Sequence, residues 1–340
     1  MKKSKRSLPF AVAGVILVAL FASVLFLLPR QGPEQSPGPP EKVSIAISTN
    51  LNPALVHIAQ AKGFFREEGL DATIQLYTFG KAALEALLNG KADFATAADT
   101  PIMFAMMKDA KLSILATIQT STKNEAVVAR KDRGITSAAD LKGRRVGVSL
   151  GTSGDYFFDS YLVLEGLARK DVDIIDLNPE EMTDSLVQGK VDAVATWNPL
   201  VTNLGTVLGD NGITLRNQSA YTGTFIIVSS QGFPEQRPEA VRRLLLALAK
   251  AESFVAASPV EAKQIMSEFC GMDRELLSDI WNDFQFNLSL NQSLLFTLED
   301  QARWAVKTGL TDRRDTLSFL ESFYFDGLRS VKPESVRIIR

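Results

Sequence analysis

The sequence predicts an α/β protein with two lobes, each built on a parallel or mixed sheet flanked by helices, followed by a helical C-terminal extension. A strand–loop–helix pattern occurs twice, at residues 43–53 and 146–155. A helix–glycine–strand pattern also occurs twice, at 87–94 and 186–193. From residue 234 onward the apolar spacing is almost wholly helical. Repeated β-α-β-α-β units of this kind imply parallel strands joined by right-handed crossovers.

The N-terminal thirty residues are first basic and then apolar. The basic stretch at positions 2–6 precedes a run from 10 to 28 that holds no charged residue. At about 1.5 Å per residue, a helix of this length nearly spans the hydrocarbon core of a bilayer. A cleavable signal peptide usually has a shorter apolar run and a small-x-small cleavage site, and no such site follows here. Residues 1–30 are therefore expected to be an uncleaved signal anchor, with a removed signal peptide as the alternative.

Either interpretation places the rest of the chain on the extracytoplasmic, periplasmic side, because positive residues stay on the inner side of the membrane. Residues 31–42 are rich in Pro, Gly and Gln, which predicts a stiff linker. The expected lobes are 43–121 for the first part of lobe 1, 122–220 for lobe 2, and 221–340 for the return to lobe 1. Two crossings between lobes form a hinge, and a hinge allows closure around a ligand.

Composition argues against several classes of protein. Five of the 37 basic residues lie in the first thirty positions, so the remainder has a net charge of about −7 against 39 acidic residues. A mildly acidic body without a basic cluster is poorly suited to nucleic acid. His57 and Cys270 are the only histidine and cysteine, so no internal disulfide, metal site or cofactor is expected. The same scarcity argues against acid–base, triad and zinc catalysis.

The first repeated unit begins with the alternating strand Val43–Ile47. The strand runs into the loop Ser48–Leu51. Asn52 is expected to cap the helix that follows, and Pro53 suits its first position because a helix needs no donor there.

The second unit repeats this arrangement about one hundred residues later. The strand Val146–Leu150 runs into the loop Gly151–Gly154, and Asp155 takes the expected capping position. Thr152 then corresponds to Thr49 of the first unit. The matching chemistry predicts that both loops lie at equivalent edges of two similar sheets.

The second half of each unit also repeats. The segments Leu87–Phe94 and Leu186–Ala193 each read as a helix that ends at a glycine and continues into a short buried strand. Each strand ends in a polar corner, at Ala98–Pro101 and Trp197–Pro199. A further helix is expected to begin after each proline. The strand expected at 222–229 returns the chain to lobe 1.

Ligands of parallel α/β sheets bind at the carboxyl ends of the strands, next to helix N-termini. That edge holds the loop after the first strand of each unit and the two polar corners. Backbone N–H groups at a helix start, together with the helix dipole, form a ready anion site. The candidate ligand-binding residues are therefore Ser48, Thr49, Asn50, Asp99, Thr100, Gly151, Thr152, Ser153, Trp197 and Asn198.

Each candidate also has a structural interpretation. The loop at 151–153 is either an anion site or a plain helix start. Asp99 either accepts a hydrogen bond from an amine or hydroxyl of the ligand or caps the helix expected at Pro101, and it would repel a bare anion. Trp197 is either a stacking wall of the pocket or a core residue near the hinge. Asn198 is either a ligand contact or a cap.

Four segments resemble the solute-binding proteins of ABC importers for nitrate, sulfonates and taurine. They lie at 61–70, 87–101, 140–148 and 192–199, and they span both lobes in the order of that family. The resemblance implies the type II periplasmic binding protein fold, with loops that hold an acidic head group from both sides. It also implies a small polar or anionic organic ligand, and docking to the permease and ATPase subunits of an importer.

Two other functions are weighed against binding for transport. A tethered lobe pair could act as a ligand-sensing domain that docks to a signalling partner, although the stretch on the inner side of the membrane is too short for an output domain. Enzymes of related fold are the pyrimidine-precursor synthases of thiamine biosynthesis and certain desulfinases. The former need a histidine and a cysteine-rich motif, and the latter a cysteine nucleophile. Cys270 lies in the helical tail, so no enzymatic activity is expected.

Overall fold

The computed structural model describes residues 39–315 and 318–339, which form one compact unit. The predicted signal anchor and most of the predicted linker lie outside the described residues. Within those two ranges, no helix is both long enough and apolar enough to cross a membrane.

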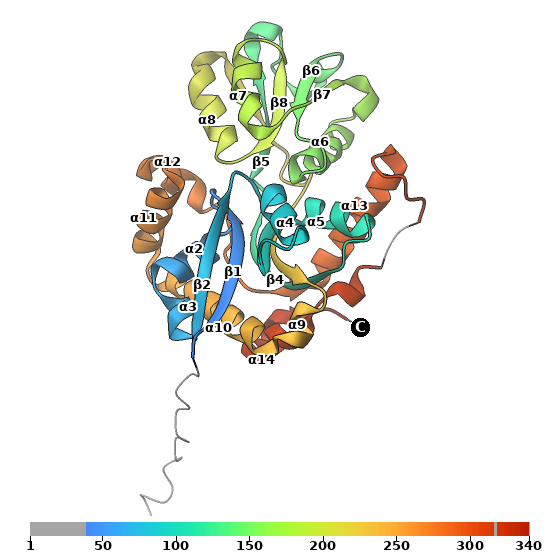
Figure 1. Ribbon diagram of the computed structural model, residues 1–340. Helices are drawn as coiled ribbons and strands as arrows, with labels where there is room; N and C mark the ends of the chain where they lie inside the picture. The colour runs from blue at the N-terminus through green and yellow to red at the C-terminus, as the bar shows by residue number, and fades with distance from the viewer. Residues whose placement is uncertain (1–38, 316–317, 340) are drawn as a thin grey trace, which may run out of the picture. The chain divides into compact units, whose positions relative to one another are not determined.

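Two five-stranded mixed sheets organise the described chain (Figure 1). The first has the order β2-β1-β3-β10-β4 and defines lobe 1; the second has the order β7-β6-β8-β5-β9 and defines lobe 2. The strands of lobe 1 are β1 (Glu41–Ser48), β2 (Leu70–Tyr77), β3 (Phe94–Ala98), β4 (Leu112–Ser121) and β10 (Gly223–Ser230). Those of lobe 2 are β5 (Glu125–Arg130), β6 (Arg145–Val148), β7 (Asp173–Asp176), β8 (Ala193–Trp197) and β9 (Gly212–Leu215).

The two sheets share one plan, as the repeated sequence units predict. In each sheet the first three strands of the unit are parallel, and a strand from elsewhere in the chain pairs antiparallel with the third. That antiparallel strand is β10 in lobe 1 and β5 in lobe 2. The prediction that the apolar strand near 222–229 returns to lobe 1 is confirmed, because β10 lies between β3 and β4. The chain changes lobe at 122–124 and 216–222.

Helices cover both sheets and build the C-terminal extension. In the repeated units they are α2 (Ala54–Ala61), α3 (Phe64–Glu67), α4 (Gly80–Leu88), α5 (Asp99–Met107), α6 (Ser153–Leu164), α7 (Pro179–Val187) and α8 (Leu200–Leu208). The extension contains α9 (Phe233–Gln236), α10 (Pro238–Ala257), α11 (Pro259–Cys270), α12 (Arg274–Trp281), α13 (Gln292–Thr308) and α14 (Phe325–Val331). A two-stranded sheet of β11 (Leu290–Asn291) and β12 (Val336–Arg337) completes it.

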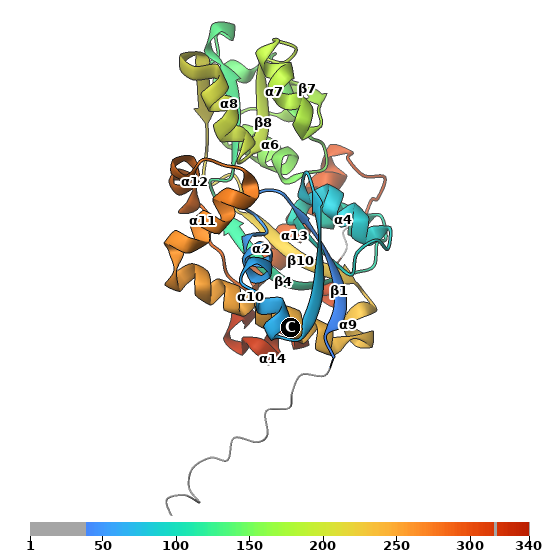
Figure 2. The same cartoon turned by 60° about the vertical axis from the view of Figure 1, so that its left-hand side comes forward.

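The helical extension packs on lobe 1. Helix α10 contacts α2, α3 and α14, and α13 contacts α5. Figures 1 and 2 both show α10 and α14 side by side at the end of lobe 1 that lies away from lobe 2. The core of lobe 1 therefore combines residues of the repeated unit with residues of the extension, such as Phe65, Ile102 and Leu248. Lobe 2 has one smaller core on each face of its sheet.

Three helix starts differ from the sequence prediction. Helix α2 has Pro53 at its N-cap and no side-chain cap, and the Asn52 N–H donates to the side chain of Asn50. Helix α6 begins at Ser153, so Asp155 lies inside its first turn rather than at the cap. Helix α5 begins at Asp99, two residues before the predicted start. In the first two loops the polar side chains bond the loop backbone instead, since Asn50 accepts from the Asn52 N–H and Asp155 accepts from the Gly151 N–H.

Candidate functional site

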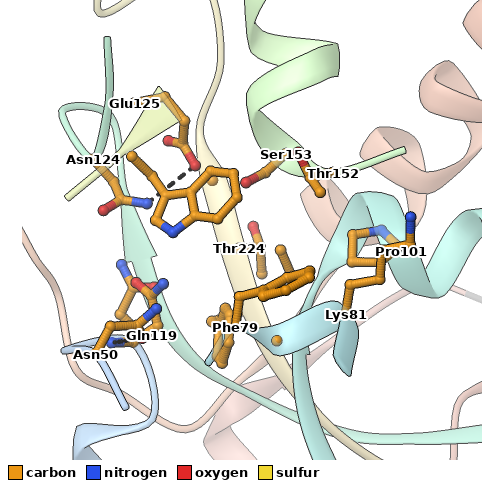
Figure 3. A pocket seen from close by; sticks show the side chains of 16 residues that line it. Asn50, Phe79, Lys81, Pro101, Gln119, Asn124, Glu125, Thr152, Ser153 and Thr224 are labelled. Atoms are coloured by element: carbon orange, nitrogen blue, oxygen red, sulfur yellow. Dashed lines mark hydrogen bonds between the residues drawn. The ribbon is translucent and has the colours of Figure 1, made fainter. Parts of the chain in front are cut away.

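A pocket lies where strand ends of the two lobes meet (Figure 3). The cavity volume is about 30 Å³, so as it stands the pocket has room for about two water molecules. The walls combine amide, hydroxyl, aromatic and charged side chains. They are Asn50, Asn52, Phe79, Gly80, Lys81, Ala98, Pro101, Gln119, Asn124, Glu125, Thr152, Ser153, Trp197, Gly223, Thr224 and Phe225.

Lobe 1 supplies its wall from the loop after β1 and from the start of α4. In the loop, the Ser48 hydroxyl and the Asn52 N–H both donate to Oδ1 of Asn50, at 3.0 and 3.1 Å. These bonds fix the buried Asn50 side chain at the end of the strand. At α4, Phe79 and Lys81 line the pocket, and Lys81 Nζ donates to the Leu150 carbonyl of lobe 2 at 3.3 Å.

Lobe 2 supplies the start of α6 and the end of β8. The Thr152 hydroxyl donates to the Ser149 carbonyl at 2.6 Å, which holds the loop that opens the helix. Trp197 packs on this helix start, because a Cβ placed on Gly154 would come within 3.3 Å of the indole ring. A glycine at 154 therefore brings the aromatic wall close to the N-terminus of α6.

The segments that join the lobes supply the remaining wall. Gln119 is near the end of β4, Asn124 is the last residue of the first crossing, and Glu125 follows it at the start of β5. Thr224 and Phe225 belong to β10, which follows the second crossing. The pocket thus lies where the chain crosses between the lobes, with walls from both lobes and from the chain between them.

The ten predicted site residues divide into two groups. Asn50, Thr152, Ser153 and Trp197 line the pocket. The others do not line it. Ser48, Thr100, Asp99 and Asn198 are buried behind the wall, Thr49 is exposed, and Gly151 faces a neighbouring space beside Lys81 and Phe104.

Asp99 differs most from its predicted place at the ligand edge. The carboxylate is fully buried and accepts hydrogen bonds from the Tyr221 hydroxyl, from Gln301 Nε2 at 3.0 Å and from the Thr100 N–H at 2.7 Å. Burial raises the pKa of Asp99 to about 6, although these donors act in the opposite direction. Asp99 therefore ties α5 to α13 and to the second crossing, and it does not cap the helix at Pro101.

Asn198 is also a structural residue. Its N–H donates to the Asn124 carbonyl at 3.0 Å, and its side-chain oxygen accepts from the Thr202 hydroxyl at 2.7 Å. It precedes Pro199, to which it is joined by a cis peptide bond. These contacts place the end of β8, and with it Trp197, against the first crossing.

Glu125 is a pocket-lining residue that the sequence interpretation missed. Its side chain is buried and lines the pocket. Asn124 Nδ2 donates to it at 3.0 Å (Figure 3), and the Ser153 hydroxyl also donates to it. Burial raises the pKa of Glu125 to about 7, while these two donors act in the opposite direction. One charged residue at the start of the apolar strand EAVVAR was the signal that could have identified it.

Three buried polar atoms of the wall have no hydrogen-bond partner. They are Asn52 Oδ1, Gln119 Nε2 and Asn124 Oδ1. A buried polar atom without a partner costs about 1–3 kcal/mol. Five other buried atoms without a partner lie outside the wall, in Thr96, Asp99, Thr196, Asn198 and Gln301. A missing partner therefore points to a ligand only where the atom also lines the pocket.

No histidine or cysteine is among the described residues that line the pocket. No group of His, Cys, Asp and Glu that could hold a metal ion occurs in the described part of the chain. Cys270 is a half-buried thiol at the end of α11, and burial raises its pKa to about 12. His57 stacks on Phe269 with ring centroids 3.5 Å apart, and burial lowers its pKa to about 4. Neither residue lines the pocket.

Comparisons with known proteins agree with this architecture. The model of the family described as NMT1/THI5 like matches residues 50–262. The taurine-binding periplasmic protein of Escherichia coli is 25% identical over 221 residues, which are 64% of this chain and 67% of that protein.

Two solved structures show the same fold. The alkanesulfonate-binding protein SsuA from Xanthomonas axonopodis pv. citri, bound to MOPS, superposes with a TM-score of 0.72 and 19% identity, covering 84% of this chain and 99% of that one. The periplasmic aliphatic sulphonate binding protein SsuA from Escherichia coli superposes with a TM-score of 0.70 and 18% identity, covering 83% and 99%. The predicted two-lobed binding-protein fold is therefore confirmed.

Proposed function

The chain belongs to the NMT1/THI5 like family, and from this we propose that it is an extracytoplasmic solute-binding protein of an ABC importer. It captures a small polar or anionic organic solute between its two lobes. The observation that carries the proposal is the pocket at the hinge, which has walls from both lobes and buried polar atoms without partners. The ligands named for the relatives, taurine and aliphatic sulfonates, are solutes of this kind.

Capture requires the lobes to separate and close, and the two segments that join the lobes allow this movement. Two short segments, 122–124 and 216–222, carry the chain between the sheets. Such paired crossings act as a hinge that absorbs the backbone change. The solute contacts both lobes at once, so its binding energy favours the closed arrangement. The closed form then docks to the permease, whose ATPase subunits drive uptake.

We propose no chemical step. Of the described residues that line the pocket, only Lys81 and Glu125 are charged, and none is a histidine or cysteine. The Cys270 thiol has no activating cation, and burial keeps it protonated. A desulfinase-type reaction needs a thiolate in the pocket, so the geometry favours binding alone.

Residues 1–30 hold the protein at the outer face of the membrane in this proposal. The apolar run at 10–28 is long enough for a single span. N-terminal sequencing of the native protein tests this directly. Recovery of Met1 supports the anchor, whereas a start after residue 28 shows a cleaved signal peptide and a free periplasmic protein.

A thermal-shift screen of sulfonates, taurine, nitrate, pyrimidines and small carboxylates tests capture. A cognate ligand at 100 times its Kd stabilises the folded state by about 2.7 kcal/mol. We expect at least one of these solutes to raise the melting temperature of the wild type. Trp197→Ala and Asn52→Ala should remove this shift, since Trp197 forms a wall and Asn52 Oδ1 is unpartnered.

Phe296→Ala provides the matched control. Phe296 is an exposed ring on α13, 57% accessible, and it lies outside the pocket. Its replacement should leave the ligand-induced shift unchanged. A shift that survives in both pocket variants would show that the solute binds elsewhere.

A further inference from the structure

Among the described residues that line the pocket, Glu125 is the only acid and Lys81 the only base. The two lie on opposite sides of it, Glu125 beside Asn124 and Lys81 beside Pro101 (Figure 3). Lys81 already donates to the Leu150 carbonyl at 3.3 Å, next to the loop that opens α6. The pocket is therefore polarised, with a carboxyl at one side and a cation with a helix N-terminus at the other.

The Glu125 carboxyl has no cation to balance it. No salt bridge to it occurs among the described residues, and its two side-chain donors, Asn124 and Ser153, are neutral. Glu125 is buried, with a relative solvent exposure of 4% for the whole residue. A buried, uncompensated carboxyl is costly, because neutral donors replace only part of the hydration that it loses. A ligand group that donates to this carboxyl lowers the cost.

Two amide oxygens of the same pocket wall also lack hydrogen-bond donors. Asn124 gives its Nδ2 to Glu125, and this leaves the buried Asn124 Oδ1 without a partner. Asn52 Oδ1, on the lobe 1 side of the same pocket, is likewise unpartnered. Two free amide acceptors and a carboxyl form a set that a bare anion cannot satisfy, since an anion brings acceptors only.

We propose that Glu125 and Asn124 form an acceptor edge that selects zwitterionic solutes, those with an amine or ammonium group a few bonds from an acidic group. Glu125 is the specificity-determining residue of this edge. The ammonium group donates to Glu125 and to Asn124 Oδ1, and the acidic group lies toward Lys81 and the start of α6. This inference rests on the proposed capture function and specifies its ligand class.

The same edge makes binding sensitive to pH. Burial raises the pKa of Glu125 to about 7, so the carboxyl of the empty pocket is partly protonated near neutral pH. A ligand ammonium requires the ionised form, so affinity falls as pH drops below about 7. The other titratable groups that act on Glu125 are Asp99 of α5 and Tyr221 of the second crossing. Neither of these two lines the pocket.

Calorimetric titration with two matched pairs of solutes tests the proposal. The pairs are taurine with ethanesulfonate and β-alanine with propionate, and the members of each pair differ only in the amine. At pH 8 we expect the wild type to bind the amine-bearing member of at least one pair more than tenfold more tightly. Between pH 8 and pH 6 that preference should shrink, as Glu125 takes up a proton.

The variant Glu125→Gln keeps the shape of the side chain and removes its charge. We expect it to lose the preference for the amine in both pairs, and to lose the dependence of that preference on pH. Glu85→Gln is the control, since Glu85 is an exposed acid on α4 outside the pocket. It should behave as the wild type does. Far-UV circular dichroism and a melting curve show that each variant is folded.

Three results would overturn the inference. One is equal affinity of the wild type for both members of each pair. Another is a preference for the amine that persists in folded Glu125→Gln. The third is the absence of binding for all four solutes while another solute of the thermal-shift screen binds, which would leave the capture function intact. Failure of the capture function is a separate result, in which no solute of the screen shifts the melting of the wild type.

Discussion

Two polar regions join lobe 1 to lobe 2, and they differ in whether their buried polar groups have hydrogen-bond partners within the protein. One is the pocket wall. The other is a clasp formed by Asp155, Asp159, Arg169 and Trp304, which links α6 of lobe 2 to α13 of the extension. Both contain buried carboxylates. Every carboxylate oxygen of the clasp has a hydrogen-bond donor within the protein, whereas several buried polar atoms of the pocket wall have no partner.

All four carboxylate oxygens of the clasp have donors. Arg169 donates to Asp155 Oδ1 and to Asp159 Oδ1, both at 2.8 Å. The Gly151 N–H donates to Asp155 Oδ2 at 2.9 Å, and Trp304 Nε1 donates to Asp159 Oδ2 at 2.7 Å. The clasp is therefore complete without a ligand, and its side chains stabilise the contact between lobes.

The pocket wall has an uncompensated Glu125 and three unpartnered amide atoms. The difference teaches that burial alone does not mark a binding residue. The mark is a buried group that lines the pocket and lacks partners, since the buried Asp99 Oδ2 also lacks a partner but lies behind the wall. Changes in the clasp should consequently reduce stability, and changes in the pocket wall should reduce affinity.

Arg169→Met is expected to have the largest effect. It leaves Asp155, which is fully buried, and Asp159 without their cation, and removing one member of a buried pair costs about 3–5 kcal/mol. Urea denaturation should show a lower midpoint. Lys170→Met, at an exposed neighbouring position, should leave the midpoint unchanged. An unchanged midpoint in Arg169→Met would show that the clasp does not stabilise the folded protein, which would contradict its contrast with the pocket wall.

Glu125→Gln should make the ligand-free protein more stable at pH 8. The folded pKa of Glu125, about 7, lies above the usual 4.5. The stability linked to this group is therefore present below about pH 4.5 and is lost as pH rises through about 7. The shift corresponds to about 3 kcal/mol at pH 8. Urea midpoints at pH 5 and pH 8 measure it, with Glu85→Gln as control. A variant less stable than the wild type at pH 8 would mean that the Glu125 charge is already compensated.

Trp304→Phe is expected to have a moderate effect. It removes the bond from Nε1 to Asp159 Oδ2 and leaves a buried carboxylate oxygen without a partner, at a cost of about 1–3 kcal/mol. Because the bond joins the lobes, we also expect faster release of a bound solute in stopped-flow dissociation. The control is Phe296→Leu, an exposed position on the same helix. A release rate equal to that of the wild type would show that the clasp does not help to hold the lobes closed around the solute.

Gln119→Met should have the smallest effect on stability, within about 1 kcal/mol, because Gln119 Nε2 has no partner to lose. Its ligand affinity should nevertheless fall. The matched variant is Gln301→Met, also at a buried glutamine, whose Nε2 donates to Asp99 at 3.0 Å. Thermal unfolding should show the larger loss in Gln301→Met. Equal losses would show that an unpartnered amide is as important to stability as a partnered one.

The sequence predicted the features that depend on local pattern. The repeated strand–loop–helix units predicted two sheets of one plan and placed Asn50, Thr152, Ser153 and Trp197 at strand ends that line the pocket. These positions follow from the rule that strand ends and helix starts share one edge of a sheet.

The features that depend on distant partners could not be predicted. Asp99 lies at a strand end, but its side chain is bound by Tyr221 and Gln301, which are 122 and 202 residues away. Gln119 and Glu125 belong to strands on either side of the first crossing, so their meeting at the pocket depends on how the two sheets pack. The spacing of residues within one repeated unit of the sequence carries no information about this packing.

A crystal structure with the tightest-binding zwitterion of the matched pairs tests the central claim most directly. The account predicts a solute enclosed in the pocket beside Trp197, with its nitrogen within hydrogen-bond distance of Glu125 and of Asn124 Oδ1, and with its acidic group toward Lys81. A solute bound outside these walls, or one whose acidic group lies against Glu125, would contradict the account.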